Sequence, residues 1–420
     1  MELLRFFTAG NVDDGKSTLI GRLLYDSNSI STDIIETLTR QSKINGTNSE
    51  IDLALLTDGL RAEREQGITI DVAYKYFSTG RRKFIIADTP GHVQYTRNMF
   101  TGASNADIAI ILVDARHGIT EQTKRHSVIC AVLGIPHVVV CVNKMDLVGY
   151  SQEKYKQIET DYRKFAVPLG LKEITFIPAS ALTGENVVTS SKNLAWYTGQ
   201  PLLSFLETVE LKKKKHTGIS RFQVQYIIRP QTEELPDYRG FAGRIIQGIY
   251  KQNQEVLILP SGIKTAIEKI EVNQKEVESA EKDTPVVIHL KDDVDVSRGD
   301  SIVPMDLLPK TSKEIVGTIC WMDNQVFTRG QKILLQQNSF RTRAILKEIV
   351  SKIDIHSCQE TEWDGTLKLN DICRVVLRTA ESISFDLYEE NRDTGAFILI
   401  NENTNNTIAA GTISGFISSN

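Results

Sequence analysis

Residues 10–17, with the sequence GNVDDGKS, have the residue types and the spacing of a phosphate-binding loop, G-x-x-x-x-G-K-[ST]. The two glycines allow several backbone N–H groups to converge on one anion, beside the positive end of a following helix. Lys16 would bridge the β- and γ-phosphates of a nucleotide, and the Ser17 hydroxyl would coordinate Mg²⁺. A turn that matches the pattern by chance is the alternative. The residues assigned to this loop are Gly10, Asn11, Val12, Asp13, Asp14, Gly15, Lys16, Ser17 and Thr18.

A threonine further along the chain could sense the γ-phosphate. Thr69 follows a long polar stretch, residues 27–66, which is either a disordered linker or a loop that orders when a ligand binds. In the second case the Thr69 hydroxyl would bind Mg²⁺ and its backbone N–H would bind the γ-phosphate. Loss of that phosphate would then release the loop. Thr69 alone is weak evidence, because threonine is common where strands begin.

A second candidate sensor consists of Asp88, Thr89, Pro90, Gly91 and His92. Asp88 could hold a water bound to Mg²⁺, and the Gly91 N–H could bind the γ-phosphate and move when it leaves. His92 is placed to orient an attacking water, although most histidines have no chemical role. A lone D-x-x-G is common by chance, but one that follows a phosphate loop favours a nucleotide switch.

Two short segments predict that the base is guanine. The Asp146 carboxylate would accept hydrogen bonds from guanine N1–H and N2–H₂, a pair of donors that adenine does not offer. Asn143 would bond the other edge of the base, the stem of Lys144 would pack on its ring, and the backbone at 180–182 could close over O6. The residues assigned to the base site are Asn143, Lys144, Met145, Asp146, Ser180, Ala181 and Leu182.

Each of these segments follows a predicted β-strand. Residues 106–114 and 137–142 are almost continuously apolar, as expected for strands covered on both faces of a parallel sheet. Because ligands bind at the carboxyl ends of such strands, the alternation predicts an α/β GTP-binding domain with a doubly wound, mostly parallel sheet. The other predicted elements are strands at 3–7 and 174–178, a hairpin at 70–77 and 83–87, and helices at 18–24 and 121–133.

The second half of the chain has a different pattern. Short alternating runs separated by Gly, Asn and Asp predict two all-β barrels, in which we find no catalytic residues. The four lysines at 212–215 could contact phosphate or another acidic surface, but a solvated tether is the more ordinary interpretation. The predicted domains are a GTP-binding domain at 1–210 and β-barrels at 218–308 and 312–420.

Composition limits the remaining function classes. A chain of 420 residues with 41% hydrophobic and 24% charged residues is typical of a soluble protein of two or three domains. Its net charge of −4 gives no reason to expect nucleic-acid binding. The five cysteines form no C-x-x-C pair, so we expect buried thiols in a reducing compartment rather than a zinc or redox site. With no long apolar run and no signal-like N-terminus, we expect a cytoplasmic protein with no membrane partner.

Taken together, these segments resemble the elongation-factor-like translational GTPases, which join a GTP-binding domain to two β-barrels. Where that superfamily commonly has histidine at positions 11 and 14 of the loop, this chain has Asn11 and Asp14. With these two residues the loop resembles one branch of the superfamily, the GTPase (large) subunits of bacterial sulfate adenylyltransferase, or ATP sulfurylase. Further similar segments lie at 12–26, 53–60, 94–99, 221–230, 295–300 and 391–400.

The resemblance implies a function for the whole chain. A separate catalytic subunit would join sulfate to ATP, giving adenosine 5′-phosphosulfate and pyrophosphate, and GTP hydrolysis on this chain would drive that uphill reaction in a heterodimer or higher assembly. It also implies that His92 orients the water, that Val12 and Ile68 flank it as an apolar gate, and that Ser17 and Thr69 hold Mg²⁺. An aminoacyl-tRNA carrier and a signalling GTPase are the alternatives.

Overall fold

The computed structural model describes residues 2–30, 33, 35–36, 53–56, 69, 71–92, 95–171, 173–211, 219–230, 238–328 and 330–417. The chain forms two compact units. Unit 1 comprises Met1–Leu211 and Ile353–Thr361, and unit 2 comprises Lys212–Lys352 and Glu362–Asn420. Within the described ranges, no helix is both long enough and apolar enough to span a bilayer.

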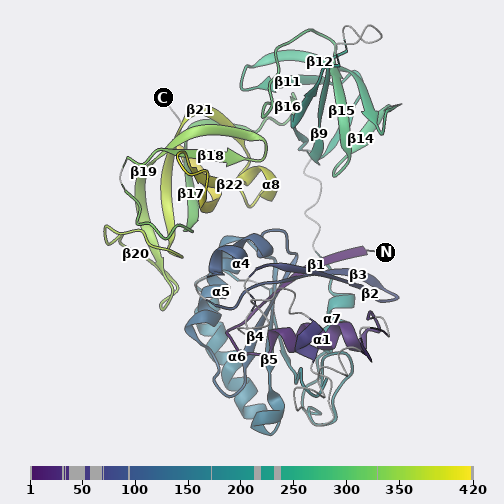
Figure 1. Ribbon diagram of the computed structural model, residues 1–420, viewed down its shortest axis with the longest axis vertical. Coiled ribbons are helices and arrows are strands. Elements are labelled where there is room, and N and C mark those ends of the chain that lie inside the picture. Colours follow the sequence, from purple (N-terminus) through teal and green to yellow (C-terminus); the bar gives the residue numbers. More distant parts are fainter. Residues whose placement is uncertain are drawn as a thin grey trace. The chain divides into compact units, whose positions relative to one another are not determined.

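Unit 1 is built on a six-stranded sheet with the order β2-β3-β1-β4-β5-β6 (Figure 1). The edge strand β2 runs antiparallel to β3, which confirms the predicted hairpin, and the other neighbours are parallel. Every residue of β4 is buried, as its continuous apolar sequence predicts. The strands are β1 (Glu2–Ala9), β2 (Ala73–Ser78), β3 (Arg82–Asp88), β4 (Ile108–Asp114), β5 (His137–Asn143) and β6 (Glu173–Pro178).

Helices cover both faces of this sheet, so the predicted doubly wound α/β fold is confirmed (Figure 1). Apolar side chains of α1 and α7 share one buried cluster with alternate residues of the strands. The helices α4, α5 and α6 lie against the other face, where Tyr162 of α6 packs on Phe176 of β6. The helical elements are α1 (Lys16–Asp26), η1 (Leu53–Leu56), α4 (Thr96–Ala103), α5 (Glu121–Val132), η3 (Met145–Val148), α6 (Gln152–Ala166) and α7 (Leu202–Thr208).

The first half of unit 2 is a closed β-barrel. Strand β11 pairs with both β16 and β12, and these pairings close the ring β11-β16-β7-β9-β15-β12. Alternate apolar residues fill its interior. The strands are β7 (Arg221–Gln223), β8 (Tyr226–Ile228), β9 (Gly240–Gln247), β10 (Ile249–Lys251), β11 (Glu255–Leu259), β12 (Ile263–Val272), β13 (Lys275–Val277), β14 (Ser279–Glu281), β15 (Pro285–Leu290) and β16 (Ser301–Pro304).

The second half of unit 2 is another closed barrel, so the prediction of two barrels is confirmed. Strand β18 pairs with both β22 and β19, closing the ring β18-β22-β23-β17-β21-β19 around a core that contains the buried Trp321. The elements are β17 (Lys310–Trp321), β18 (Ile333–Gln337), β19 (Phe340–Asp354), β21 (Ile372–Phe385), α8 (Arg392–Gly395), β22 (Ala396–Asn401) and β23 (Thr407–Ile417). The short strand β20 (Gln359–Thr361) extends the same sheet but belongs to the Ile353–Thr361 segment of unit 1.

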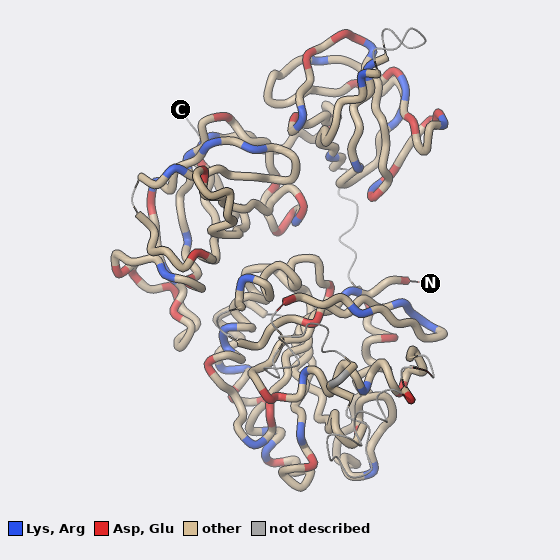
Figure 2. Tube along the Cα trace, in the orientation of Figure 1, with Lys and Arg blue, Asp and Glu red and all other residues tan. Residues whose placement is uncertain are grey.

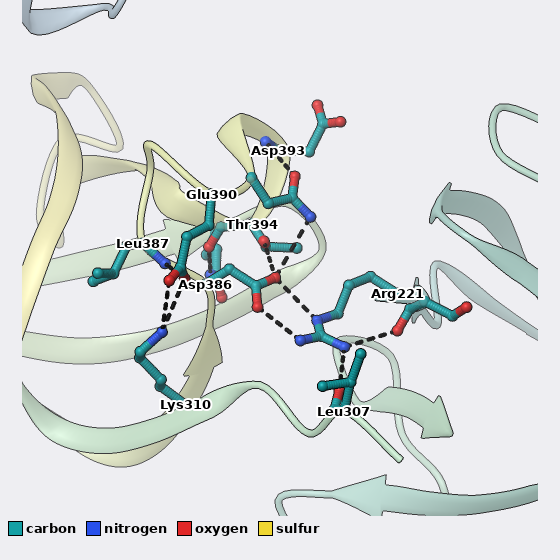
Figure 3. Close-up of polar contacts among 11 residues, drawn as sticks. Arg221, Leu307, Lys310, Asp386, Leu387, Glu390, Asp393 and Thr394 are labelled. Carbon is teal, nitrogen blue, oxygen red and sulfur yellow. Dashed lines mark hydrogen bonds and ion pairs between the residues drawn. The ribbon is translucent and has the colours of Figure 1, made fainter. Parts of the chain in front are cut away.

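A buried bidentate ion pair joins the two barrels within unit 2 (Figure 3). Arg221 donates from Nε and Nη2 to the two oxygens of Asp386 at 2.9 and 2.7 Å, and from Nη1 to the Leu307 carbonyl at 2.8 Å. Thr394 donates a further hydrogen bond to Asp386 at 2.7 Å. Because both charged side chains are almost fully buried, each depends on the other for compensation.

The charged residues are mixed in sign, and the cysteine thiols are buried as predicted. Lysine and arginine alternate with aspartate and glutamate along both units, with no long block of either sign in the described ranges (Figure 2). All five cysteines lie in the described ranges, where they are buried and form no disulfide. Burial raises the pKa of Cys141 to about 12, so this thiol stays protonated and unreactive at neutral pH.

Candidate nucleotide site

The phosphate loop connects β1 to α1, as predicted. Gly15 immediately precedes α1 with a φ of +88°, a left-handed conformation that glycine adopts without steric cost. A Cβ atom on Gly15 would lie 2.5 Å from Asn143 Nδ2, so the loop also needs glycine for a close approach. The first turn of α1 has no acidic residue and no side-chain cap. Its free N–H groups and positive dipole end therefore suit an anion.

Lys16, Asp88 and Thr69 come together at this loop, although they are far apart in the sequence. Lys16 Nζ lies 3.2 Å from Asp88 Oδ1 and donates to Thr69 Oγ1 at 2.8 Å. The side chains of Lys16 and Asp88 are 8% and 2% exposed, which makes the pair a buried one. The ammonium group thus gathers a hydroxyl and a carboxylate, the kinds of oxygen donor that Mg²⁺ prefers.

Gly91 lies directly against the phosphate loop. A Cβ atom on Gly91 would lie 2.3 Å from the carbonyl oxygen of Gly10, so no other residue fits there without a shift of the backbone. His92, the next residue, is half-buried, and its ring lies 6.1 Å from that of Tyr95 between centroids. Val12 is also half-buried. The other member of the predicted apolar gate, Ile68, lies outside the described residues.

The base segment is tied to the phosphate loop by Asn143, which is buried at the end of β5. Its Nδ2 donates to the Asp14 carbonyl at 2.8 Å, and its Oδ1 accepts from the Ala181 N–H at 2.9 Å. Asn143 therefore connects three segments that sequence reasoning treated separately. This positioning role was not predicted, and the predicted contact of Asn143 with the base stays a prediction.

Lys144 has a carboxylate partner that sequence reasoning missed. Its Nζ lies 3.1 Å from Asp114 Oδ2 at the end of β4 and also donates to the Asp13 carbonyl of the phosphate loop. Arg116 contacts the same carboxylate at 2.7 Å. Burial opposes ionisation, but the hydrogen bonds from Arg116 and Lys144 outweigh it and lower the pKa of Asp114 below its usual value.

One carboxylate oxygen of Asp146 is available to bind a ligand. Its Oδ1 is buried and has no hydrogen-bond partner among the residues that the structure describes. Because a buried acceptor without a partner is costly, such an atom indicates that a donor from outside the chain completes the site. Nearby, Arg22 of α1 donates to the Ala181 carbonyl at 3.1 Å and to the Leu182 carbonyl, which fixes the 180–182 loop beside the base segment.

Asp14 introduces a titratable group into the phosphate loop. It is 5% exposed, and its Oδ2 accepts the Asn11 N–H at 2.7 Å. Burial raises the pKa of Asp14 to about 7, against the opposing effect of that hydrogen bond. The carboxyl group therefore titrates near neutral pH beside the predicted phosphate site.

Apart from Thr69, the predicted site residues that the structure describes lie at the carboxyl ends of strands of one sheet. Gly10 to Thr18 follow β1, and Ser180 to Leu182 follow β6. The other two segments begin at the last residue of a strand: Asp88 to His92 at the end of β3 and Asn143 to Asp146 at the end of β5. No cluster of three or more His, Cys, Asp or Glu side chains suited to a metal occurs in the described ranges.

Two protein-family models match parts of the chain. Residues 1–215 match the elongation factor Tu GTP binding domain, and residues 314–414 match the GTP-eEF1A C-terminal domain-like family. The GTPase-like domain of S. cerevisiae Ski7, bound to GTP, aligns with a TM-score of 0.53 and 17% identity over 98% of this chain and 97% of that one. This likeness concerns the fold alone.

Among the sequence relatives that match almost the whole chain are proteins of known family. Sulfate adenylyltransferase subunit 1 of Colwellia psychrerythraea is 49% identical over 98% of this chain and 88% of its own length. The bifunctional enzyme CysN/CysC of Mycobacterium tuberculosis is 48% identical over 98% of this chain and 67% of its own length. The chain therefore belongs to the sulfate adenylyltransferase subunit 1 family, whose GTP-binding domain is of the elongation factor Tu type.

Proposed function

We propose that this chain is the GTPase subunit of a sulfate adenylyltransferase. GTP hydrolysis in unit 1 drives the formation of adenosine 5′-phosphosulfate and pyrophosphate from ATP and sulfate on a partner catalytic subunit, in sulfate assimilation. The observation that carries the proposal is that the phosphate loop meets the Asp88 segment through Lys16–Asp88 and the base segment through Asn143–Asp14. Identities of 48–49% to family members over 98% of the chain favour this function over that of an aminoacyl-tRNA carrier.

The phosphate loop and Lys16 bind the β- and γ-phosphates of GTP. The residues present fit Mg²⁺, because Thr69 and Asp88 already place oxygen atoms around one cation, the Lys16 ammonium. Ser17 and Thr69 would hold the ion directly and Asp88 through a water. When bound, Mg²⁺ neutralises charge that develops on the phosphate oxygens.

His92 orients the water that attacks the γ-phosphate, and Val12 and Ile68 exclude other water from its path. The chemistry is phosphoryl transfer to water, in which positioning and electrostatics supply most of the rate. A half-buried position next to Gly91 suits His92 for this role, because Gly91 touches the phosphate loop. Thr89 and Pro90, which precede Gly91, belong to the same nucleotide-binding segment.

Asp146 selects guanine with the carboxylate oxygen that no described group satisfies. Asn143 and Lys144 hold the base segment against the phosphate loop through their contacts with the Asp14 and Asp13 carbonyls. Met145 is fully buried and fixes the turn between them and Asp146. The backbone of Ser180, Ala181 and Leu182 closes over guanine O6.

The chain works with a catalytic sulfate adenylyltransferase subunit, as a heterodimer or a higher assembly, in the cytoplasm and without nucleic acid or membrane. The term "subunit 1" in the relative's name supports a partner subunit. Copurification tests this part: a protein partner with adenylyltransferase activity is expected, and a bound RNA of tRNA size would instead indicate the carrier. Titration of the purified chain with GTP, GDP and ATP tests the site itself, and equal affinity for ATP and GTP would contradict the assignment.

A further inference from the structure

A glutamine on α5 holds the backbone that leads into His92. Gln122 Nε2 donates to the Gly91 carbonyl at 2.9 Å, and the contact is buried. The Gly91 carbonyl and the His92 N–H belong to the same planar peptide group. A hydrogen bond that fixes the Gly91 carbonyl therefore fixes the orientation of this peptide plane, and with it the backbone N–H of His92.

The same peptide is restrained from its other side by the phosphate loop. A Cβ atom on Gly91 would lie 2.3 Å from the Gly10 carbonyl oxygen, so Gly91 has no free space on that side. Gln122 and Gly10 thus confine Gly91 between α5 and the loop that would bind phosphate. A small shift of Gln122 or Gly10 would therefore also move the backbone of His92.

His126 sets the orientation of the Gln122 amide. His126 Nε2 lies 3.1 Å from Gln122 Nε2, one helical turn along α5, and both side chains are buried. Burial lowers the pKa of His126 to about 3, with smaller contributions from Arg125 and Lys16. The neutral ring can therefore accept a hydrogen bond from Gln122 at Nε2. Turning the amide over would place its oxygen against the Gly91 carbonyl oxygen, two acceptors facing each other.

The helix that carries these residues is well anchored. Thr120 and Thr123 form a reciprocal capping box at its first turn, immediately around Gln122. Further along, the Ser127 hydroxyl lies 2.8 Å from the Tyr162 hydroxyl of α6. His126 Nδ1 is buried without a hydrogen-bond partner among the described residues, a cost that an apolar residue at this position would avoid. Packing of α5 alone therefore does not explain why Gln122 and His126 are polar.

We propose that Gln122 is a positioning residue for GTP hydrolysis: it orients the Gly91–His92 peptide, and with it the His92 imidazole, while His126 orients Gln122. This inference rests on the proposed function and adds a residue to its machinery. Gln122 acts through His92 and does not touch the nucleotide. Its loss should therefore lower kcat for hydrolysis with little effect on GTP binding.

The test uses the full chain and compares Gln122→Met, which keeps the length but cannot donate, with Gln122→Glu, whose carboxylate would face the Gly91 carbonyl. Single-turnover GTP hydrolysis should slow about 10-fold or more in both. The Kd for GTP should change less than about threefold. Gln157→Met, at an exposed position on α6, is the matched control and should hydrolyse GTP normally. Thermal unfolding of each variant shows whether the fold is retained.

The decisive comparison is made in the His92→Ala background. If Gln122 acts through His92, adding Gln122→Met to His92→Ala should produce almost no further loss. His126→Gln, which retains a polar amide able to accept from Gln122, should keep more activity than His126→Leu. Equal losses from Gln122→Met in both backgrounds, or a Gln122→Met variant with normal hydrolysis, would overturn the inference. Normal hydrolysis by His92→Ala would instead overturn the role proposed for His92, and this inference with it.

Discussion

Lys16 and Asp88 form a buried ion pair that joins the phosphate loop to the carboxyl end of β3, with Nζ and Oδ1 3.2 Å apart. Removing one partner of such a pair leaves an uncompensated buried charge and costs about 3–5 kcal/mol. We predict that Lys16→Met destabilises nucleotide-free unit 1 by about this amount and abolishes GTP binding. Lys16→Met combined with Asp88→Asn should recover much of the stability but none of the binding.

Denaturant unfolding of the nucleotide-free chain measures the stability, and titration with a fluorescent GTP analogue measures the binding. The double variant separates the two roles of Lys16, because it restores charge balance without restoring the ammonium. Recovery of GTP binding in the double variant would show that Lys16 supports the fold and not the phosphates.

Replacing Asp146 should change which base is bound. Asp146→Asn removes the acceptor for the guanine N2 amino group and supplies an amide donor that suits the carbonyl of xanthine. We expect GTP affinity to fall about 10- to 100-fold and xanthosine triphosphate affinity to rise. Competition between the two nucleotides gives the ratio directly. Unchanged preference for GTP would contradict the assignment of the unpartnered Asp146 oxygen to the base.

His92→Ala should slow GTP hydrolysis about 100-fold or more, because the attacking water loses the group that orients it. The affinity for GTP should change little, since His92 is not assigned to phosphate binding in the ground state. His356→Ala, at an exposed position, serves as the matched control. Normal single-turnover hydrolysis in His92→Ala would remove His92 from the mechanism.

The buried His126 predicts instability in acid. Burial lowers its pKa from 6.5 to about 3, so below pH 6.5 the unfolded chain binds a proton that the folded chain does not. Stability from this group is therefore fully present above pH 6.5 and is lost as the pH falls toward 3. Between pH 7 and pH 5 the loss should be about 2 kcal/mol.

His126→Gln removes this titration while keeping a polar side chain beside Gln122. Denaturant midpoints at pH 7 and pH 5 should therefore differ less in the variant than in the parent chain. An equal difference in both proteins would mean that other groups cause the acid sensitivity of unit 1.

Local signals in the sequence predicted the fold class and the strand ends that carry the site. The loop at 10–17, the buried strand β4 and the alternating runs of the barrels each combine a residue pattern with a local structure, and the structure confirms those elements. Helix α6 was not predicted, although the sequence contains a signal for it. Tyr155, Ile158 and Tyr162 recur with helical spacing after the Ser151 cap, and they are buried.

The contacts that join those elements could not be predicted in the same way. The Arg221–Asp386 pair spans 165 residues, and the Asn143–Asp14 contact spans 129. Gln122 and His126 lie in a helix whose sequence has no distinctive motif, and only the approach of Gly91 reveals their contact. Such pairs depend on tertiary packing, which a single sequence does not encode in any local pattern.

The central claim is that GTP hydrolysis at this site drives sulfate activation, and one measurement tests it most directly. The complex of this chain with its catalytic subunit is supplied with ATP and sulfate, and adenosine 5′-phosphosulfate is measured with GTP, with GDP and with a non-hydrolysable GTP analogue. We expect product to accumulate well beyond its GDP level only with GTP, and His92→Ala to reduce this gain in parallel with hydrolysis. Equal accumulation under all three conditions would contradict it.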